Sequence, residues 1–122
     1  MVDLAALRGE LTTALHGVSA TVDGELVLLT AHTTQPYPVM AWDVWPTWLA
    51  VRPVAMCVQE TDWQACVALP GGDPQSTVAA GDAFVEPVAT ALQAYQLTTI
   101  QPGQVIVSDG GNVPILIFNI TI

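Results

Sequence analysis

The sequence contains no lysine, and its two arginines, Arg8 and Arg52, stand against eleven acidic residues. The formal net charge is −9. Proteins that hold DNA or RNA by attraction neutralise phosphates with clustered Lys and Arg, and anionic membranes are bound through the same residues. Two separated arginines cannot form such a cluster, so we expect neither nucleic-acid binding by attraction nor membrane binding. GC-rich coding, which would also remove lysine, is the alternative explanation of the composition.

Long hydrophobic runs are missing as well. No stretch reaches the roughly 18 consecutive apolar residues that a membrane-spanning helix needs, so we expect none. The N-terminal sequence MVDLAALRGELTTAL is acidic and periodic, unlike the basic and then apolar pattern of a secretory signal peptide. We therefore expect a protein that stays inside the cell when it is made, where disulfides are not the default.

Catalytic and metal-binding motifs are also lacking. The three serines lie outside any GxSxG sequence, and His16 and His32 do not have the spacing of a zinc site. The glycine pair Gly71-Gly72 is followed by Asp73, whose carboxylate would repel a phosphate. We expect no enzyme activity, no cofactor and no bound metal.

Charged residues make up only 11% of the chain, whereas roughly 25% is usual for a globular domain. Either neutral polar residues finish the surface, or the chain is an oligomer whose interfaces take the place of the missing charges. The length of 122 residues predicts a single domain, residues 1–122.

The first third of the chain predicts a helix and a strand. Apolar residues recur at helical spacing from Leu4 to Leu15, which indicates an amphipathic helix that ends near Gly17. After the turn signal Asp23-Gly24, the segment GELVLLTAHT is rich in apolar residues and is typical of a strand.

Three of the four tryptophans then fall within the sequence WDVWPTW. Prolines at 36, 38 and 46 interrupt regular structure, so we predict a long Trp- and Pro-rich loop from Thr33 to Trp48. Three interpretations of the tryptophans are open: a cluster that caps the core, a platform that stacks on a sugar, or a protein interface, where tryptophan is enriched. The candidate interface residues are Trp42, Asp43, Trp45, Pro46 and Trp48.

The segments VRPVAMCVQ and WQACVALP predict a β-hairpin with a two-residue turn at Thr61-Asp62. In that register Val58 pairs with Ala65, and the large apolar residues of both strands share one face. The same register sets Cys57 opposite Cys66, where a disulfide is geometrically feasible. We expect buried free thiols instead, acting as small hydrophobic side chains.

Asp73 followed by Pro74 is typical of a helix start, with an N-cap residue and proline at the first helical position. Apolar or small residues recur from there to Tyr95 at positions 78, 81, 85, 88, 92 and 95, which predicts a helix of about five turns. Pro87 lies inside this pattern and predicts a kink or a break. Gly81, on the buried stripe, predicts a close approach of the helix to the sheet.

Asp82 and Glu86 lie four residues apart on the exposed face of this helix. Like charges at that spacing destabilise a helix by a few tenths of a kcal/mol. Either this is an ordinary solvated face, or it is an acidic stripe directed at something outside the domain.

The C-terminal sequence QVIVSDGGNVPILIFNITI predicts a hairpin around DGGN. Its second strand is apolar on both faces, so we expect both faces to be covered. The order of helix, strand, long loop, two strands, helix and two strands indicates an α+β domain with a mostly antiparallel sheet packed by two helices.

Several of these features resemble one known family. They are YPVMAWDVWP, the segment WQACVALP, the helix GGDPQSTVAAGDAFVEPVATAL and the closing hydrophobic hairpin. In this order, after a leading amphipathic helix in a short acidic chain, they resemble the tail terminator proteins of long-tailed bacteriophages.

The resemblance implies a structural protein of the virion, assembled in the host cytoplasm. Such proteins form a hexameric ring on the last ring of the tail tube, stop tube polymerisation and join the tail to the head connector or stopper protein. DNA would pass through the lumen without specific binding, because a negative lumen repels phosphates. The family uses no cofactor and has no catalytic residues.

Two other functions stay open. The first is a monomeric binding module that takes a sugar or peptide on the Trp-rich loop. The second is another phage neck protein, a head-tail adaptor or a stopper. Adaptors of this kind are largely helical and stoppers are largely β-barrels, whereas this sequence predicts two helices together with two hairpins.

Overall fold

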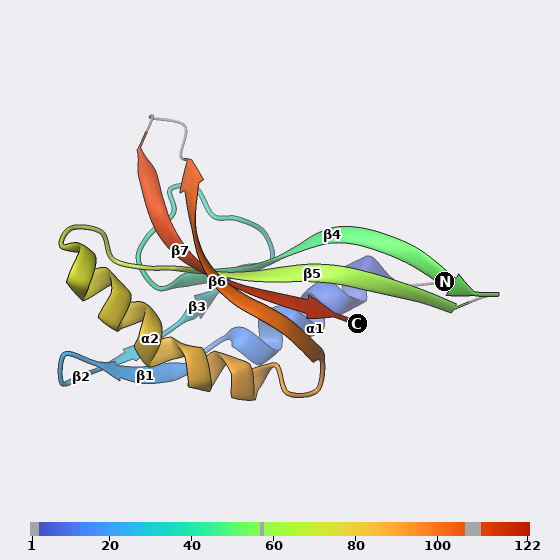
Figure 1. The fold of residues 1–122 in the computed structure, drawn as a ribbon, viewed down its shortest axis with the longest axis horizontal. Helices are drawn as coiled ribbons and strands as arrows, with labels where there is room; N and C mark the ends of the chain where they lie inside the picture. The colour runs from blue at the N-terminus through green and yellow to red at the C-terminus, as the bar shows by residue number, and fades with distance from the viewer. Residues whose placement is uncertain (1–2, 57, 107–110) are drawn as a thin grey trace.

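The computed structural model describes residues 3–56, 58–106 and 111–122 (Figure 1). The chain has the α+β fold that the sequence predicts. The elements in chain order are α1 (Leu4–Leu15), β1 (Ser19–Val22), β2 (Glu25–Leu28), β3 (Thr30–Ala31), β4 (Asp43–Ala55), β5 (Val58–Ala68), α2 (Pro74–Ala91), β6 (Gln96–Ile106) and β7 (Asn112–Thr121).

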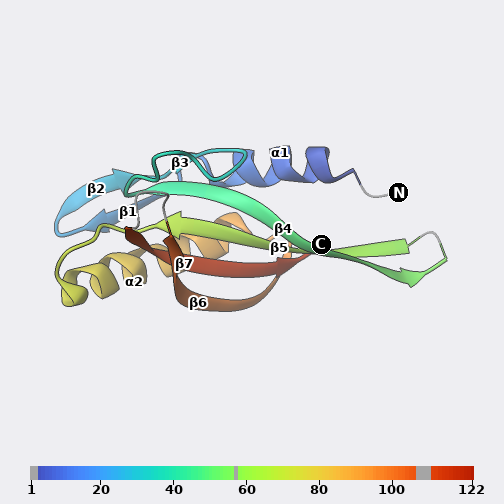
Figure 2. The ribbon, with the colours of Figure 1, turned by 90° about the horizontal axis from the view of Figure 1, so that it is seen from above.

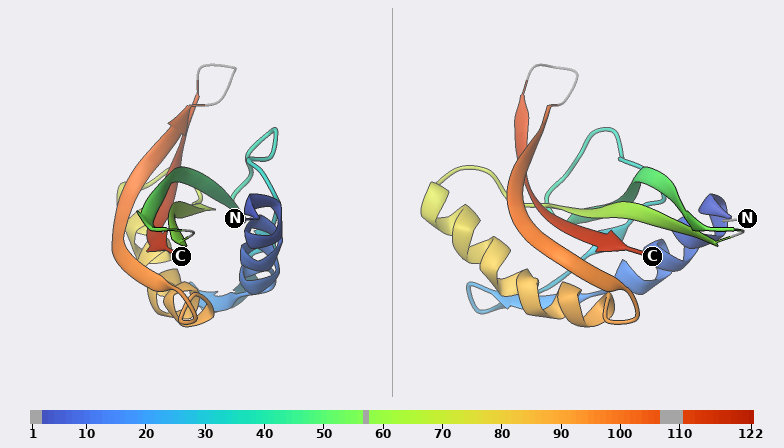
Figure 3. Two further views of the ribbon diagram at one scale, coloured as in Figure 1. Left: turned by 90° about the vertical axis from the view of Figure 1, so that its right-hand side faces the viewer. Right: turned by 45° about the vertical axis from the view of Figure 1, so that its right-hand side comes forward.

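The main sheet has five strands in the order β3-β4-β5-β7-β6. Only the β3–β4 pair is parallel, and the other three pairs are antiparallel. Strands β1 and β2 form a separate hairpin. Side chains from α1, α2 and one face of the sheet share a single core, so both helices cover the same face. Figure 3 shows from two sides that β6 and β7 curve strongly and that their upper ends lie away from the helices.

The leading helix begins and ends where the sequence predicts. Asp3 is its N-cap, and the carboxylate accepts a hydrogen bond from the Ala6 amide at 3.0 Å. Leu11 and Leu15 are fully buried in the core. The turn signal that follows is confirmed as well: Asp23 and Gly24 both have positive φ and close the β1–β2 hairpin.

Helix α2 also starts as predicted, with Asp73 as N-cap and Pro74 in the first turn. Val88 and the C-cap residue Leu92 are fully buried. Pro87 does not break the helix, which continues through it to Ala91, so of the two predicted effects only the kink stays a prediction.

The buried stripe of α2 differs from the predicted one at its start. Val78 is 62% exposed, whereas Ala80 and Phe84 are buried. Gly81 is buried as expected, and a Cβ at this position would lie 3.3 Å from the Leu69 side chain. The small residue therefore permits the predicted close contact with the sheet end.

The C-terminal hairpin consists of β6 and β7, although residues 107–110 of its predicted turn lie outside the described residues. Leu116, Phe118 and Ile120 enter the main core. Ile115 belongs to a second apolar cluster on the other face of the sheet, against which Val39 of the long loop packs. Apolar groups therefore cover both faces of β7 near Ile115.

The predicted turn at Thr61-Asp62 was wrong. Strand β5 runs through these residues, and the hairpin closes where Ala55 pairs with Val58. Ala65 pairs with Pro46 instead of Val58. Val54 and Met56, expected in the core, are 57% and 92% exposed.

The predicted Trp- and Pro-rich loop, Thr33 to Trp48, extends too far toward the C-terminus. Residues 32–42 are irregular, but strand β4 starts at Asp43 and includes Pro46 and Trp48. Proline fits here because β3 pairs with β4 at Asp43 and Val44, and no other described strand pairs along the rest of that edge. A residue without an N–H is tolerated on such an edge.

The outer parts of β4 and β5 form a projecting hairpin, which we call the arm and define as residues 49–56 and 58–60. Strand β5 pairs with β7 only from Asp62 inward. Beyond that point the described strand pairs join the two strands of the arm to each other. Figure 2 shows the arm extending past the end of β7 and past α1.

Candidate assembly surface

Trp42 holds the long loop against the body of the protein. Its amide donates to the Ala68 carbonyl at 2.7 Å, and its carbonyl accepts from the Thr30 amide at 3.0 Å. Its ring packs on Phe84 of α2, with ring centroids 5.0 Å apart. The side chain is half-buried against the main core, and the backbone has a φ of 71°. Trp42 therefore packs within its own chain.

Asp43, the next candidate, is buried and satisfied. One carboxylate oxygen lies 2.9 Å from Nε2 of His32, and the other accepts from the Met40 amide at 2.8 Å. Both contacts join the long loop to the start of β4. The side chain is 8% exposed, so its role is to fix the loop.

Trp45 and Pro46 are buried too. Trp45 is 1% exposed and forms the second apolar cluster with Cys66, Ala68 and Ile115. Three of the five predicted interface residues, Asp43, Trp45 and Pro46, are thus covered by their own chain. The interpretation of the tryptophans as a core cluster holds for Trp42 and Trp45.

Trp48 differs from the other two. It is 43% exposed and stands at the root of the arm, opposite Trp63 in the β4–β5 ladder. It begins a series of exposed apolar side chains that continues outward through Leu49, Val51, Val54 and Met56. Isolated exposed apolar residues are ordinary, but five of them within residues 48–56 of one projecting hairpin indicate an interaction surface.

Sequence reasoning missed the outer members of this series because it assigned the segment to the core. One signal could have identified them. Residues 44–59 contain no Asp or Glu, although the chain carries eleven, and their only charge is Arg52. A long stretch without acidic residues that is not buried in the core of its own chain is a candidate for contact with another chain.

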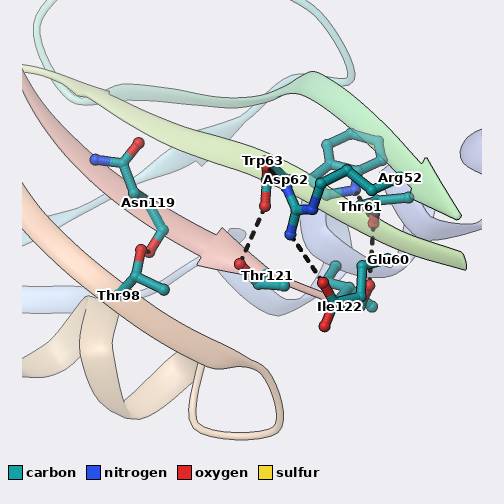
Figure 4. A network of polar contacts seen from close by, with 9 residues as sticks. All are labelled: Arg52, Glu60, Thr61, Asp62, Trp63, Thr98, Asn119, Thr121 and Ile122. Atoms are coloured by element: carbon teal, nitrogen blue, oxygen red, sulfur yellow. Dashed lines mark hydrogen bonds and ion pairs between the residues drawn. The ribbon is translucent and has the colours of Figure 1, made fainter. Parts of the chain in front are cut away.

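Arg52 braces the arm from the face opposite the helices (Figure 4). Its guanidinium bonds both Asp62 and Glu60, the latter at 2.9 Å. The hydrogen bond from Arg52 is the largest cause that lowers the pKa of Asp62, and Thr121 Oγ1 adds a donor at 3.1 Å. The ion pairs of Arg52 with Glu60 and Asp62 are solvent-exposed, so they orient the two strands more than they stabilise the fold.

The base of the arm is fixed by Thr61, which is fully buried. Its backbone N–H and C=O both bond Ile122, each at 2.9 Å. Its hydroxyl accepts from the indole N–H of Trp63 at 2.9 Å. On the face without helices, a polar row crosses the sheet from β5 to β7 to β6, in which Gln64 donates to Asn119 and Asn119 donates to Thr99.

The predicted acidic pair lies far from the arm. Asp82 and Glu86 are both exposed, as expected. They line an open cleft of about 700 Å³ between α2 and the segment 17–21, which includes part of β1. The described residues contain no group of three or more His, Cys, Asp or Glu side chains placed to hold a metal ion.

The observed register sets Cys66 opposite Trp45 and Ile117, so its neighbours across the sheet differ from the predicted one. Cys57 itself lies outside the described residues. Cys66 is a free, buried cysteine, and burial raises the pKa of its thiol to about 11. The thiol therefore stays protonated at neutral pH and packs as a small apolar group.

Comparison of the chain with protein-family models, with curated proteins and with solved structures finds no match. Neither described helix is long and apolar enough to cross a membrane.

Proposed function

We propose that this chain is a structural ring protein of a long-tailed bacteriophage, acting as the tail terminator at the head-proximal end of the tail tube. The observation that carries the proposal is the arm. Its exposed apolar side chains project away from the body, and the described part of the chain does not cover them. A second polypeptide that covered them would gain the free energy of their burial.

In this role, several copies close into a ring, a hexamer by resemblance to the family. One side of the ring contacts the tail tube protein and ends its polymerisation, and the other side contacts the head connector or stopper. The acidity of the chain suits a lumen through which DNA slides, since negative walls repel phosphates. Of the exposed acidic pair on α2, Asp82 and Glu86, it is Glu86 that is free to line such a lumen.

The alternative functions have less support. A sugar platform on the Trp-rich loop needs several accessible rings, whereas Trp45 is buried and Trp42 packs on Phe84. The fold combines two helices with a five-stranded open sheet, which differs from both a helical adaptor and a β-barrel stopper.

The direct test uses phage particles that encode this chain. Mass spectrometry of purified virions should detect the protein at a few copies per particle. Deletion of its gene should yield tails of uncontrolled length that do not join heads, seen by electron microscopy. Tails of normal length in the deletion strain, or absence of the protein from virions, would rule out the terminator role.

A further inference from the structure

We infer that the arm of one copy docks in an apolar cleft on the next copy, between α2 and the β6–β7 hairpin, so that copies join head to tail. The inference rests on the proposed ring function and supplies its contact. The partner of the arm is thus a second copy of this chain.

The cleft lies where α2 passes over the strands. It is lined mainly by apolar residues, among them Leu69, Val78, Gly81, Pro102, Pro114 and Leu116. Its volume is about 220 Å³, below the roughly 300–1,000 Å³ of small-molecule pockets. A recess of this size fits one or two apolar side chains of a protein partner. Val78 stands at the cleft and is 62% exposed, so the apolar surface continues outside it.

The arm and the cleft lie in opposite halves of the molecule. In Figure 1 the arm extends to the right, whereas the first half of α2, which borders the cleft, lies to the left. One chain cannot bring its own arm into its own cleft. A projection and a recess on different surfaces of one subunit make a heterologous contact, which forms a ring when the rotation between copies closes.

Charge favours a second copy as the occupant. Two copies, each with a net charge of −9, repel over most of their surfaces. Residues 44–59 contain no carboxylate, and Glu60 at the base of the arm is paired with Arg52, so the arm is where another acidic chain meets the least repulsion. Asp82 is the acidic residue that lines the cleft, and it would face this carboxylate-free segment.

The free edge of β4 is unsuited to the other common contact, extension of the sheet. The Val44 carbonyl accepts a hydrogen bond from the His32 amide, so the backbone polar groups of Val44 point toward that edge. Backbone groups two residues apart on a strand point the same way, so the backbone of Pro46 points toward the edge too. Both backbone groups of Thr61 bond Ile122, on the side of β5 away from β4. The backbone groups of its β4 partner, Val51, therefore point away from β5 and toward the free edge, and those of Pro53, two residues on, do the same. Both prolines lack the N–H that an added strand would need. The arm therefore docks through its side chains.

Met56 is the best anchor for the cleft, because it is 92% exposed near the outer end of the arm. Its flexible thioether side chain adapts to irregular recesses. A stable interface buries about 800 Å² on each partner, so the Met56 contact is the centre of a larger surface that includes Val54 and the surroundings of Val78.

The test compares three variants that each add one negative charge at an exposed apolar position: Met56→Glu on the arm, Val78→Glu at the cleft, and Leu26→Glu on β2 as the matched control. Sedimentation should show that the first two raise the Kd of self-association roughly tenfold or more, the loss of a hot-spot contact. Leu26→Glu should assemble like wild type. All three should stay folded, and the thermal midpoint of Val78→Glu should fall only slightly, because its new charge lies four residues before Asp82 on α2.

Mixing the two defective variants gives the sharper result. The intact arm of Val78→Glu fits the intact cleft of Met56→Glu, so the mixture should form a heterodimer that cannot grow. A mixture that stays monomeric, a Val78→Glu protein that assembles like wild type, equal loss in all three variants, or a wild-type protein that never self-associates would each overturn the inference. A heterodimer from a protein that is absent from virions would keep this contact and reject only the terminator role.

Discussion

Trp48 and Trp63 lie directly opposite each other in the β4–β5 ladder, yet Trp63 is fully buried and Trp48 is 43% exposed. The Arg8 guanidinium lies 5.9 Å from the centre of the Trp63 ring. This pair marks the boundary between the body and the arm. Residues inside it hold the fold, and residues beyond it are available to another chain.

The first prediction separates the buried and exposed tryptophans. Trp45→Ala should lower the free energy of unfolding by about 3–5 kcal/mol, because it empties a buried site of the second apolar cluster. Trp48→Ala should lower it by about 1 kcal/mol or less, since much of that side chain already contacts water. Urea unfolding followed by circular dichroism measures both values.

The same two variants also test the interface. Trp48→Ala should fold but weaken self-association, with the unfolding result serving as its control. Equal destabilisation by the two substitutions, with no further loss of assembly for Trp48→Ala, would place Trp48 in the core and contradict its assignment to the interface.

The second prediction concerns the buried face of α2. Leu92→Ala should cost roughly 2–5 kcal/mol, as truncation of a fully buried leucine does. Val78→Ala, on the exposed face, should change stability by no more than about 0.5 kcal/mol. Thermal unfolding of both variants gives the comparison. An unchanged midpoint for Leu92→Ala would show that the stripe is misassigned.

The third prediction is the acid response of the arm. Arg52 lowers the pKa of Asp62, so the folded state favours the carboxylate. The contribution to stability is therefore present above the ordinary Asp pKa of about 3.9 and is lost as the pH falls through the lowered value. Carbon NMR titration of the Asp62 carboxyl should show the lowered pKa.

Arg52→Gln provides the control for this titration. It removes the donor that has the largest effect, so the pKa of Asp62 should rise toward the ordinary value. An Asp62 titration that is identical in the two proteins would show that the ion pair does not form in solution.

The fourth prediction is that Cys66 resists alkylation in the folded protein. Its thiol is buried and its pKa is raised to about 11, so little of the reactive thiolate exists at neutral pH. Iodoacetamide without reductant should label Cys66 only after denaturant is added, as peptide mass spectrometry would show. Rapid labelling of Cys66 in the native protein, or a disulfide at this residue, would contradict the structure.

The sequence by itself determined the elements that depend on local chemistry. Asp73 and Pro74 start α2 because a capping carboxylate and a fixed φ act within one turn. Asp23-Gly24 forms the predicted turn because both positions accept positive φ. The alternation of Leu116, Phe118 and Ile120 identified one buried face of β7, because a strand side chain points to the same face every second residue.

Only the tertiary structure decided the register of β4 and β5. The predicted partner of Ala65 was Val58 and the observed partner is Pro46, an even number of residues away. Alternation of apolar residues has a period of two, so it cannot distinguish registers that differ by an even shift. That choice turned a predicted core hairpin into an exposed arm and placed a predicted turn inside β5.

The fate of the tryptophans depended on the same long-range pairing. Pro46 is compatible with a strand only where the neighbouring edge is free, and β3 leaves that edge after Val44. Trp45 is covered because its position in β4 sets it beside Cys66 and Ile115, whereas Trp48 lies where the body ends and the arm begins. The sequence places three tryptophans in one short segment, but the position of each in the folded sheet decides whether its ring is buried or can be reached by another chain.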